Sequence, residues 1–298
     1  MKVFVTGATG VLGQSAISAL VTDGHDVTGL ARNEEKAEIL EALGAAACRA
    51  HLFDLDDMTA VLSGFEVVCN LATHIPVGLA GIRRGAWKVN DKLRIDGSKV
   101  VVTAARQAGV RKLVQESVSF LYADGGDEWI TESSPLAVTR AVEPSAVAES
   151  NVAGFDSPSR AAVVLRFGQL VGNDATTRWR LAQARSGRPI GMGDPQGWAH
   201  VVHPEDAGAA VAVAVTAPAG VYNVGAEPVR RDEMTSVFAD TVGRAELGFM
   251  PRIVVRVAGE RMELLTRSQR VSSDRFHEVS GWKPVHHVFD ASWLPHAA

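Results

Sequence analysis

The sequence predicts an α/β protein, a doubly wound parallel sheet followed by a smaller C-terminal lobe. Short apolar strands alternate with helical segments through the first half of the chain, which is typical of a parallel sheet covered by helices on both faces. A glycine-rich turn directly follows the first strand and opens the first helix. Beyond the middle, Pro and Gly become frequent at residues 187–197 and 218–228, which indicates a lobe of mixed structure at the sheet's edge.

Each predicted element follows from a local pattern of apolar residues. Strands are expected at residues 2–6, 26–32, 48–55, 67–73, 112–119, 162–171 and 221–225. Helices are expected at residues 11–22, 34–43, 87–108 and 231–242, and Gly109 is expected to end the long third one.

Composition and charge exclude several classes of protein. Of 298 residues, 46% are hydrophobic and 21% are charged, which is ordinary for a globular protein. A net charge of −4 without a basic stripe argues against a nucleic-acid partner. The sequence shows no signal peptide and no apolar stretch of about 20 residues, so we expect a cytoplasmic protein without a membrane partner. Cys48 and Cys69 lie in apolar runs, where we expect reduced thiols.

The strongest motif is the turn at residues 6–13, which reads Thr-Gly-Ala-Thr-Gly-Val-Leu-Gly. Its first glycine lets the chain turn sharply, its second lets the backbone approach a pyrophosphate, and its third lets the helix pack closely on the strand. The helix N-terminus adds free N–H groups and the positive end of a dipole. The turn therefore predicts a dinucleotide cofactor; the alternative is a glycine turn without a ligand. The expected contacts are Gly7, Thr9, Gly10, Val11, Leu12 and Gly13.

The spacing Gly-x-x-Gly-x-x-Gly after a threonine resembles the short-chain dehydrogenases/reductases, and later segments resemble their extended branch. These segments are Asp54-Leu55, Asn70-Leu71-Ala72-Thr73, Asp96-Gly97-Ser98, and residues 163–172, 202–206, 222–225 and 281–284. With this resemblance, residues 1–165 are expected to form a Rossmann dinucleotide-binding domain. Residues 166–298 are expected to form mainly a substrate-binding lobe, with some segments returning to the sheet. The resemblance further implies cofactor contacts at Asp54, Leu55, Leu71, Ala72 and Thr73.

The end of the second strand indicates which cofactor is used. An acidic side chain there would favour NAD by hydrogen bonding to the adenosine ribose. Residues 30–33 instead read Leu-Ala-Arg-Asn, and Arg32 can pair with a 2′-phosphate and stack on adenine. We therefore expect NADP(H). The alternative is a solvated arginine in a charged corner with Glu34, Glu35 and Lys36.

The catalytic residues usual in this family are absent. Its members carry a Ser or Thr after the fifth strand and a Tyr-x-x-x-Lys helix, in which the Tyr is the general acid/base. Here no Tyr or Lys occurs at residues 123–160. Alignment on Tyr122 places Val118 at the Ser position, and alignment on the family's usual glutamate places Ala141 and Ser145 at the Tyr and Lys positions.

Four side chains are weak candidates for catalysis, and the catalytic residue itself stays unknown. Ser117 and Ser119 flank the Ser position, although β alternation points them the same way unless the strand ends between them. Tyr122 could donate a proton, but it more often lines the pocket in this family. His74 follows the fourth strand at its carboxyl end, where open sheets bind ligands; the alternative is a histidine bonded to backbone. No His or Cys pair has metal-ligand spacing, so we expect no metal.

These departures resemble atypical reductases of actinobacterial aromatic-polyketide pathways, such as angucyclinone ketoreductases. We therefore predict an NADPH-dependent ketoreductase of a polycyclic aromatic ketone in antibiotic biosynthesis. Its proton would come from water, another side chain or the substrate's own hydroxyl. Trp179, Met192 and Trp198 are candidate apolar walls for that substrate, or else core and lid packing. Two alternatives stay open, a reductase of another small carbonyl and a non-catalytic NADP(H)-binding redox sensor, and so does the oligomeric state.

Overall fold

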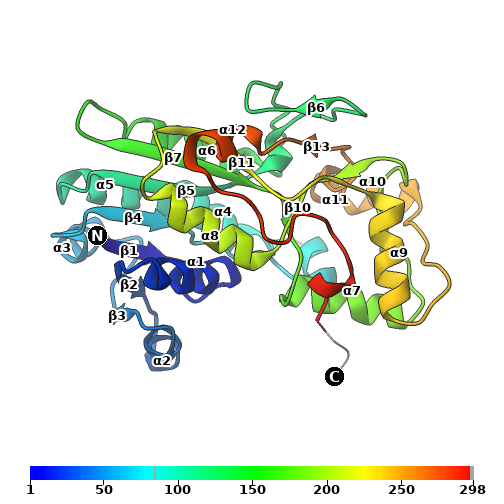
Figure 1. The fold of residues 1–298 in the computed structure, drawn as a ribbon, viewed down its shortest axis with the longest axis horizontal. Coiled ribbons are helices and arrows are strands. Elements are labelled where there is room, and N and C mark those ends of the chain that lie inside the picture. The colour runs from blue at the N-terminus through cyan, green and yellow to red at the C-terminus, as the bar shows by residue number, and fades with distance from the viewer. Residues whose placement is uncertain (84, 296–298) are drawn as a thin grey trace.

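The computed structural model describes residues 1–83 and 85–295 and has the predicted α/β architecture (Figure 1). Its centre is a seven-stranded sheet in the order β11-β7-β5-β4-β1-β2-β3, in which all neighbouring strands are parallel. The direction of winding reverses at β1, which is where open α/β sheets bind ligands. The strands are β1 (Lys2–Thr6), β2 (Asp26–Leu30), β3 (Ala46–Cys48), β4 (Val67–Asn70), β5 (Lys112–Val118), β7 (Ala161–Phe167) and β11 (Gly220–Val224).

Helices cover both faces of the sheet, and each face has its own hydrophobic core (Figure 1). One core packs against four helices, α1 (Val11–Thr22), α2 (Glu34–Ala42), α8 (Pro204–Ala214) and α12 (Asp274–Ser280). The other core packs against α3 (Leu55–Leu62), α5 (Ser98–Gln107) and α6 (Glu143–Ala153). Burial on both faces explains why the strands read as continuous apolar runs.

The long helix predicted at residues 87–108 is present but contains one wide turn. It comprises α4 (Lys88–Lys92), the π-helical turn η2 (Leu93–Gly97) and α5. Gly109 follows with a φ of 76°, as expected of a glycine that ends a helix. The wide turn buries Arg94, whose guanidinium pairs with the Glu116 carboxylate of β5 at 2.7 Å.

Two predicted strands differ from the structure. The strand expected at residues 48–55 is wrong beyond Cys48, because the Asp54 carboxylate accepts hydrogen bonds from the N–H groups of Asp56 and Asp57 and caps helix α3. The segment 162–171 divides at Gly168 into β7 and β8 (Gln169–Leu170). There the chain passes so close to the backbone of His200 that a Cβ on Gly168 would lie 2.9 Å from it.

The second half of the chain builds the lobe and also returns to the sheet. β11 and α8 pack with the sheet, whereas the lobe has its own core around Leu181, Phe238 and Trp293. The lobe contains α7 (Ala175–Arg185), α9 (Arg231–Thr241), α10 (Arg252–Ala258), α11 (Glu260–Leu264) and η4 (Ala291–Trp293). Three short strand pairs accompany it: β8 with β10 (Val201–Val202), β9 (Trp198–Ala199) with β12 (Val229–Arg230), and β6 (Trp129–Ile130) with β13 (Arg270–Val271).

The two cysteines are free thiols, as expected. Cys69 in β4 is fully buried, and burial raises the pKa of its thiol to about 12, so the thiol is protonated and unreactive at neutral pH. Cys48 is only half-buried. In the part of the chain that the structure describes, no helix is long and apolar enough to cross a membrane.

Candidate functional site

The glycine turn after β1 has a geometry that only glycine permits at two positions. Gly7 has a φ of 66°, and a Cβ on it would lie 2.4 Å from the carbonyl oxygen of Leu71. A Cβ on Gly13 would lie 2.2 Å from the carbonyl oxygen of Gly7. Gly10 differs, because a Cβ there would meet only the Gly7 carbonyl oxygen, at 3.3 Å, so its outer side is open.

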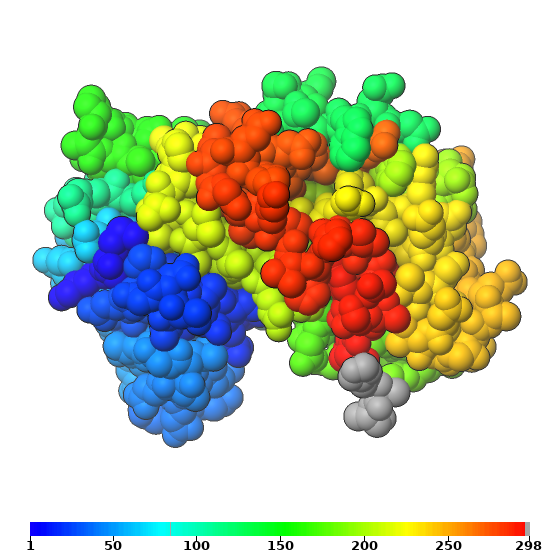
Figure 2. All heavy atoms as spheres, in the orientation of Figure 1, coloured from blue at the N-terminus to red at the C-terminus, as the bar shows by residue number. Residues whose placement is uncertain are grey.

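The open side of the turn is suited to an anion. Gly10 is the N-cap of α1 and supplies no side chain to its N–H groups, so the helix N-terminus is left for a ligand. Thr9 and Val11 are accessible beside it. Ala72 and Thr73, which follow β4, are half-exposed at the same edge of the sheet. These features fit a dinucleotide pyrophosphate, and Figure 2 shows the surface indented between α1–α2 and α7 at this end of the sheet.

Arg32 extends into solvent beyond β2. Within the described residues Arg32 forms no ion pair. The two carboxylates that follow it in the sequence pair with other cations, Glu34 with Arg49 and Glu35 with Lys36. The guanidinium of Arg32 is therefore free for a phosphate group. Asp54 is exposed, and its Oδ1 is already engaged by the N–H groups at the start of α3.

The region that usually holds the family's catalytic residues forms a buried polar network instead. Ser117 donates a hydrogen bond to Glu149 Oε1 at 2.6 Å, and Arg166 binds the same carboxylate with two nitrogens at 2.9 and 2.6 Å. Arg166 also donates to the Tyr122 hydroxyl at 2.9 Å, and that hydroxyl donates to Asn223 Oδ1 at 2.7 Å. Each polar side chain of this network therefore forms a hydrogen bond with another side chain of the protein.

Burial and charge set the protonation states in this network. Burial is the main cause that raises the pKa of the Tyr122 hydroxyl, outweighing the opposite effect of Arg166. Burial lowers the pKa of Arg166, but hydrogen bonding and charge from Glu149 raise it further, so the net change is upward. Tyr122 is fully buried, so its hydroxyl holds Arg166 and Asn223 in place and faces no substrate.

The other two candidate residues lie in different surroundings. β5 ends at Val118, so Ser119 opens the 3-10 turn η3 (Ser119–Leu121) instead of pointing with Ser117. Ser119 is buried and its hydroxyl contacts Gln269 Oε1 at 3.3 Å. His74 is exposed in the loop after β4, and only its backbone N–H is engaged, by Asn90 Oδ1 at 3.1 Å. Of the four candidates, only His74 presents its side chain to the surface near the cofactor end of the sheet.

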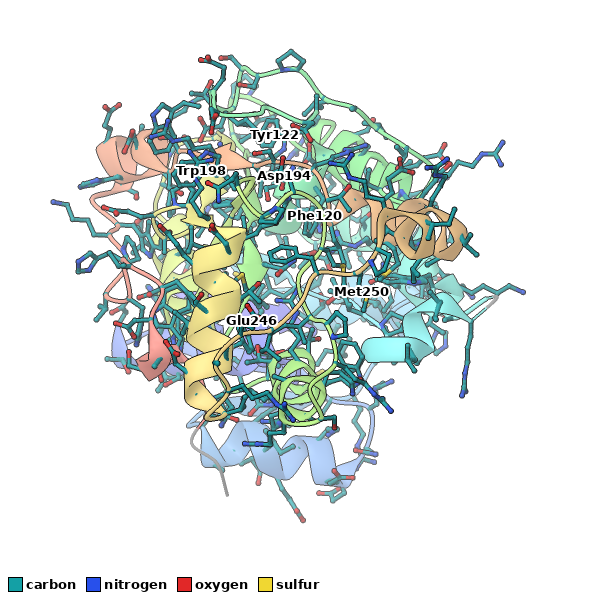
Figure 3. All side chains as sticks on the ribbon, turned by 90° about the vertical axis from the view of Figure 1, so that its right-hand side faces the viewer. Phe120, Tyr122, Asp194, Trp198, Glu246 and Met250 are labelled. Atoms are coloured by element: carbon teal, nitrogen blue, oxygen red, sulfur yellow. The ribbon has the colours of Figure 1, made fainter. Side chains whose placement is uncertain are left out.

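A cavity lies between the lobe and the carboxyl ends of β5 and β7. Phe120 and Gln169, just past these two strands, form one wall, and Met192 and Trp198 of the lobe line it as well. Figure 3 views the molecule from the lobe and labels Phe120 and Trp198. Trp179 is not part of this wall, because its ring packs against Gly78 of η1 (Gly78–Ile82), where an added Cβ would lie 2.5 Å from the ring. Sequence reasoning missed the rest of the lining, which comes from distant segments: Arg180, Ile190, Gly191, Ala199, His200, Arg231, Met234, Thr235, Phe238, Leu265, Arg267 and Gln269.

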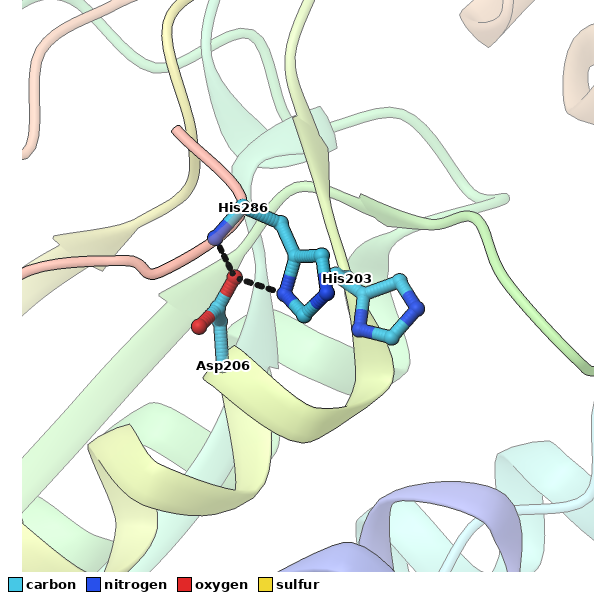
Figure 4. Close-up of side chains that lie close together, drawn as sticks. All are labelled: His203, Asp206 and His286. Carbon is cyan, nitrogen blue, oxygen red and sulfur yellow. Dashed lines mark hydrogen bonds and ion pairs between the residues drawn. The ribbon is translucent and has the colours of Figure 1, made fainter. Parts of the chain in front are cut away.

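A second polar cluster brings together His203, Asp206 and His286 from opposite ends of the C-terminal half (Figure 4). Asp206 is buried and accepts hydrogen bonds from the N–H groups of Val285 and His286 and from His286 Nδ1, at 2.8, 2.9 and 3.0 Å. The two imidazole rings stack with centroids 3.8 Å apart. Because both oxygens of the carboxylate are engaged, the cluster fastens the C-terminal segment to α8.

Comparisons with known proteins give matches over much of the sequence. The model of a family described as NAD(P)H-binding matches residues 7–191. A Streptomyces protein named 3-diazoavenalumate denitrifying reductase is 32% identical over 305 positions, which cover 96% of this chain and 97% of that protein. A ketoreductase of Stigmatella aurantiaca, named for 4-hydroxy-2-methyl-3-oxo-4-farnesyl-3,4-dihydroquinoline-1-oxide, is 30% identical over 164 positions, 52% of this chain and 47% of that protein.

Solved structures show the same fold at low sequence identity. A human epimerase family protein with NADPH has a TM-score of 0.79 at 20% identity and covers 98% of both chains. UDP-glucose-4-epimerase from Stenotrophomonas maltophila, with NAD and formylated UDP-arabinopyranose, has a TM-score of 0.78 at 20% identity, with coverage of 99% of this chain and 95% of the other. These likenesses show that the chain shares its fold with these proteins.

Proposed function

Because the chain belongs to the NAD(P)H-binding family, as an atypical short-chain dehydrogenase/reductase that acts as an NAD(P)H-dependent reductase, we propose that it uses NADPH to reduce an aromatic ketone. When bound, NADPH supplies a hydride to the acceptor. The protein then has three tasks: to bind the dinucleotide at the glycine turn, to hold the acceptor against it, and to exclude water. Residues 1–165 perform the first task, and residues 166–298, with the loop after β4, perform the others.

The observation that carries this proposal is the structural use of the family's catalytic region. Tyr122, Ser117 and Glu149 bind one another and Arg166, and the positions expected for Tyr and Lys hold the buried residues Ala141 and Ser145. The protein therefore supplies no tyrosine–lysine acid. A ketone with a neighbouring hydroxyl suits such a site, because its own hydrogen bond stabilises the developing alkoxide and its proton replaces one from the enzyme.

Exposed apolar side chains support the proposal that the acceptor is aromatic. Ile75, Leu79 and Ile82 are exposed in the loop after β4, and Ile253, Val254 and Val257 are exposed on α10. This loop is held between the lobe helices, since Trp179 of α7 packs on it and Arg261 of α11 lies 4.2 Å from the ring centre of Trp87 at its end. Exposed apolar groups of this kind suit a large flat ligand of the angucyclinone type.

The Streptomyces relative supports a second candidate, the reductive removal of a diazo group from an aromatic acid. The name of that protein denotes a diazo-substituted carboxylate and a denitrifying reduction. Hydride addition to an aromatic diazonium ion forms a carbon–hydrogen bond, releases dinitrogen and requires no proton. A site without an acid/base pair suits this reaction at least as well as ketone reduction.

The test is NADPH oxidation with a panel of a hydroxylated angucyclinone-type ketone, simple carbonyls and a hydroxyarenediazonium salt. Tyr122→Phe is expected to keep turnover within about threefold and to lower the free energy of unfolding by about 1–3 kcal/mol, because Arg166 and Asn223 each lose a buried partner. Loss of turnover with NADPH binding intact would make Tyr122 the acid and contradict the proposal. Tight NADPH binding without turnover on the whole panel would favour the redox sensor.

We also propose that Arg32 selects NADPH through the 2′-phosphate, assisted by the turn residues Thr9 to Gly13 and by Leu71 to Thr73. Arg32→Ala is expected to raise the KM for NADPH about 10- to 100-fold and to change the KM for NADH far less, because both cofactors have the adenine and only NADPH carries that phosphate. Arg49→Ala is the matched control, since Arg49 is also exposed and pairs with Glu34. Equal changes in both KM values for Arg32→Ala would refute the assignment.

A further inference from the structure

The cavity beneath the lobe has an unusual electrostatic character. Among the residues that the structure describes, no carboxylate lines it, whereas three arginines, one histidine and two glutamines do: Arg180, Arg231, Arg267, His200, Gln169 and Gln269. Guanidinium groups in a recess normally have carboxylate partners, because burying an unpaired charge is costly. The positive charge in this cavity therefore requires an explanation.

Arg180 of α7 has the least compensation. Arg180 is half-exposed, and among the residues that the structure describes it forms neither an ion pair nor a hydrogen bond; partial desolvation in the cavity lowers the pKa of its guanidinium. Asp174 is the charge that opposes this effect. That carboxylate is occupied, since it caps α7 by accepting hydrogen bonds from the N–H groups of Thr176 and Thr177 and from the Thr177 hydroxyl. Arg180 thus faces the cavity with its donors free.

The other two arginines are held by backbone carbonyl oxygens and lie near carboxylates, Asp124 and Asp194 for Arg231 and Asp124 and Glu263 for Arg267. Arg267 donates to the carbonyl oxygens of Phe120 and Tyr122 at 3.0 and 2.9 Å. Arg231 donates to the carbonyl oxygens of Asp194, at 3.4 Å, and of Arg267. Because these carboxylates partly offset the charge of Arg231 and Arg267, Arg180 is the arginine whose charge most affects the cavity.

His200 is the second unsatisfied group. The residue is only 3% exposed, and within residues 1–83 and 85–295 neither ring nitrogen has a hydrogen-bond partner. The ring lies so close to Gly225 that a Cβ there would be 2.0 Å from Nε2, so His200 cannot turn to find another partner on that side. Buried polar groups without partners in a native fold indicate a missing ligand or water.

We propose that this cavity binds a carboxylate of the substrate, with Arg180 as its principal partner. The inference rests on the proposed reductase function and specifies its substrate as an aromatic acid. The free space in the cavity is about 50 Å³, which is ample for a carboxylate group with a few water molecules. Phe120 lines the cavity and directly follows the carboxyl end of β5, the edge of the sheet that also carries the cofactor turn, so we place the aromatic part of the substrate on that side.

Binding of trans-cinnamate, with cinnamamide as its uncharged counterpart, tests this site on the full-length protein by calorimetry. Wild type is expected to bind cinnamate at least 10-fold more tightly than cinnamamide. Arg180→Met is expected to abolish that preference, and Arg180→Lys to retain part of it, because lysine keeps the charge and loses the planar pair of donors. Arg178→Met on the exposed side of α7 is the matched control and should retain the full preference.

Three outcomes would overturn the proposal: equal affinity for cinnamate and cinnamamide, an undiminished preference in Arg180→Met, or inorganic phosphate bound as tightly as cinnamate. The same experiments distinguish failure of the reductase proposal from failure of the carboxylate site. If cinnamate binds with the expected preference but no substrate of the panel oxidises NADPH, the anion site stands and the reductase function falls.

Discussion

Arg166→Met is expected to lower the free energy of unfolding by about 3–5 kcal/mol. The guanidinium and the Glu149 carboxylate have side chains only 6% and 13% exposed, so removing Arg166 leaves a carboxylate without its cation inside the protein. The Tyr122 hydroxyl loses its donor in the same step. Urea unfolding of wild type and variant at neutral pH measures the loss.

The matched variant is Glu149→Leu combined with Arg166→Met. Removing both charges is expected to recover at least half of the loss, because no ion is then buried alone. A single variant that loses less than about 1 kcal/mol would show that Glu149 becomes protonated or hydrated at little cost. In that event the network would not be the element that fixes Tyr122.

The network also shows where sequence reasoning stops. The glycine turn was predictable because strand, turn and helix follow one another within residues 2–22, and Gly7 and Gly13 each have a local steric reason. The role of Tyr122 could not be predicted from the sequence, because its hydroxyl contacts Asn223, which is 101 residues away along the chain. One local signal was available: Arg166 is a charged residue in an otherwise apolar strand, and such a residue needs a buried partner.

The same contrast explains the error at β3. The apolar and aromatic residues before Asp54 were interpreted as strand, but Asp54 followed by Asp56 and Asp57 is a local helix-start pattern, with an N-cap and acidic residues in the first turn. That pattern could have corrected the prediction. The cavity could not have been predicted in this way, since Phe120, Arg180, His200 and Arg267 come together only through the tertiary fold.

His200 is expected to make the protein acid-sensitive. Burial lowers the pKa of its imidazole from 6.5 to about 3, so between these values the unfolded chain binds a proton that the folded protein does not. The contribution of neutral His200 to the free energy of unfolding is therefore fully present above pH 6.5, and it decreases as the pH falls toward 3. The linkage relation gives about 1.4 kcal/mol per pH unit, or roughly 3 kcal/mol by pH 4.

His200→Asn and His200→Gln should remove this part of the pH dependence, although both are expected to be less stable than wild type at neutral pH because they pack the site less well. Urea unfolding between pH 7 and pH 4 measures the slope, and identical slopes in wild type and both variants would contradict the prediction. Cinnamate gives an independent measurement, since a carboxylate at Arg180 would lie beside the ring and favour its protonated form. Saturating cinnamate should therefore reduce the acid sensitivity of wild type and leave that of His200→Asn unchanged.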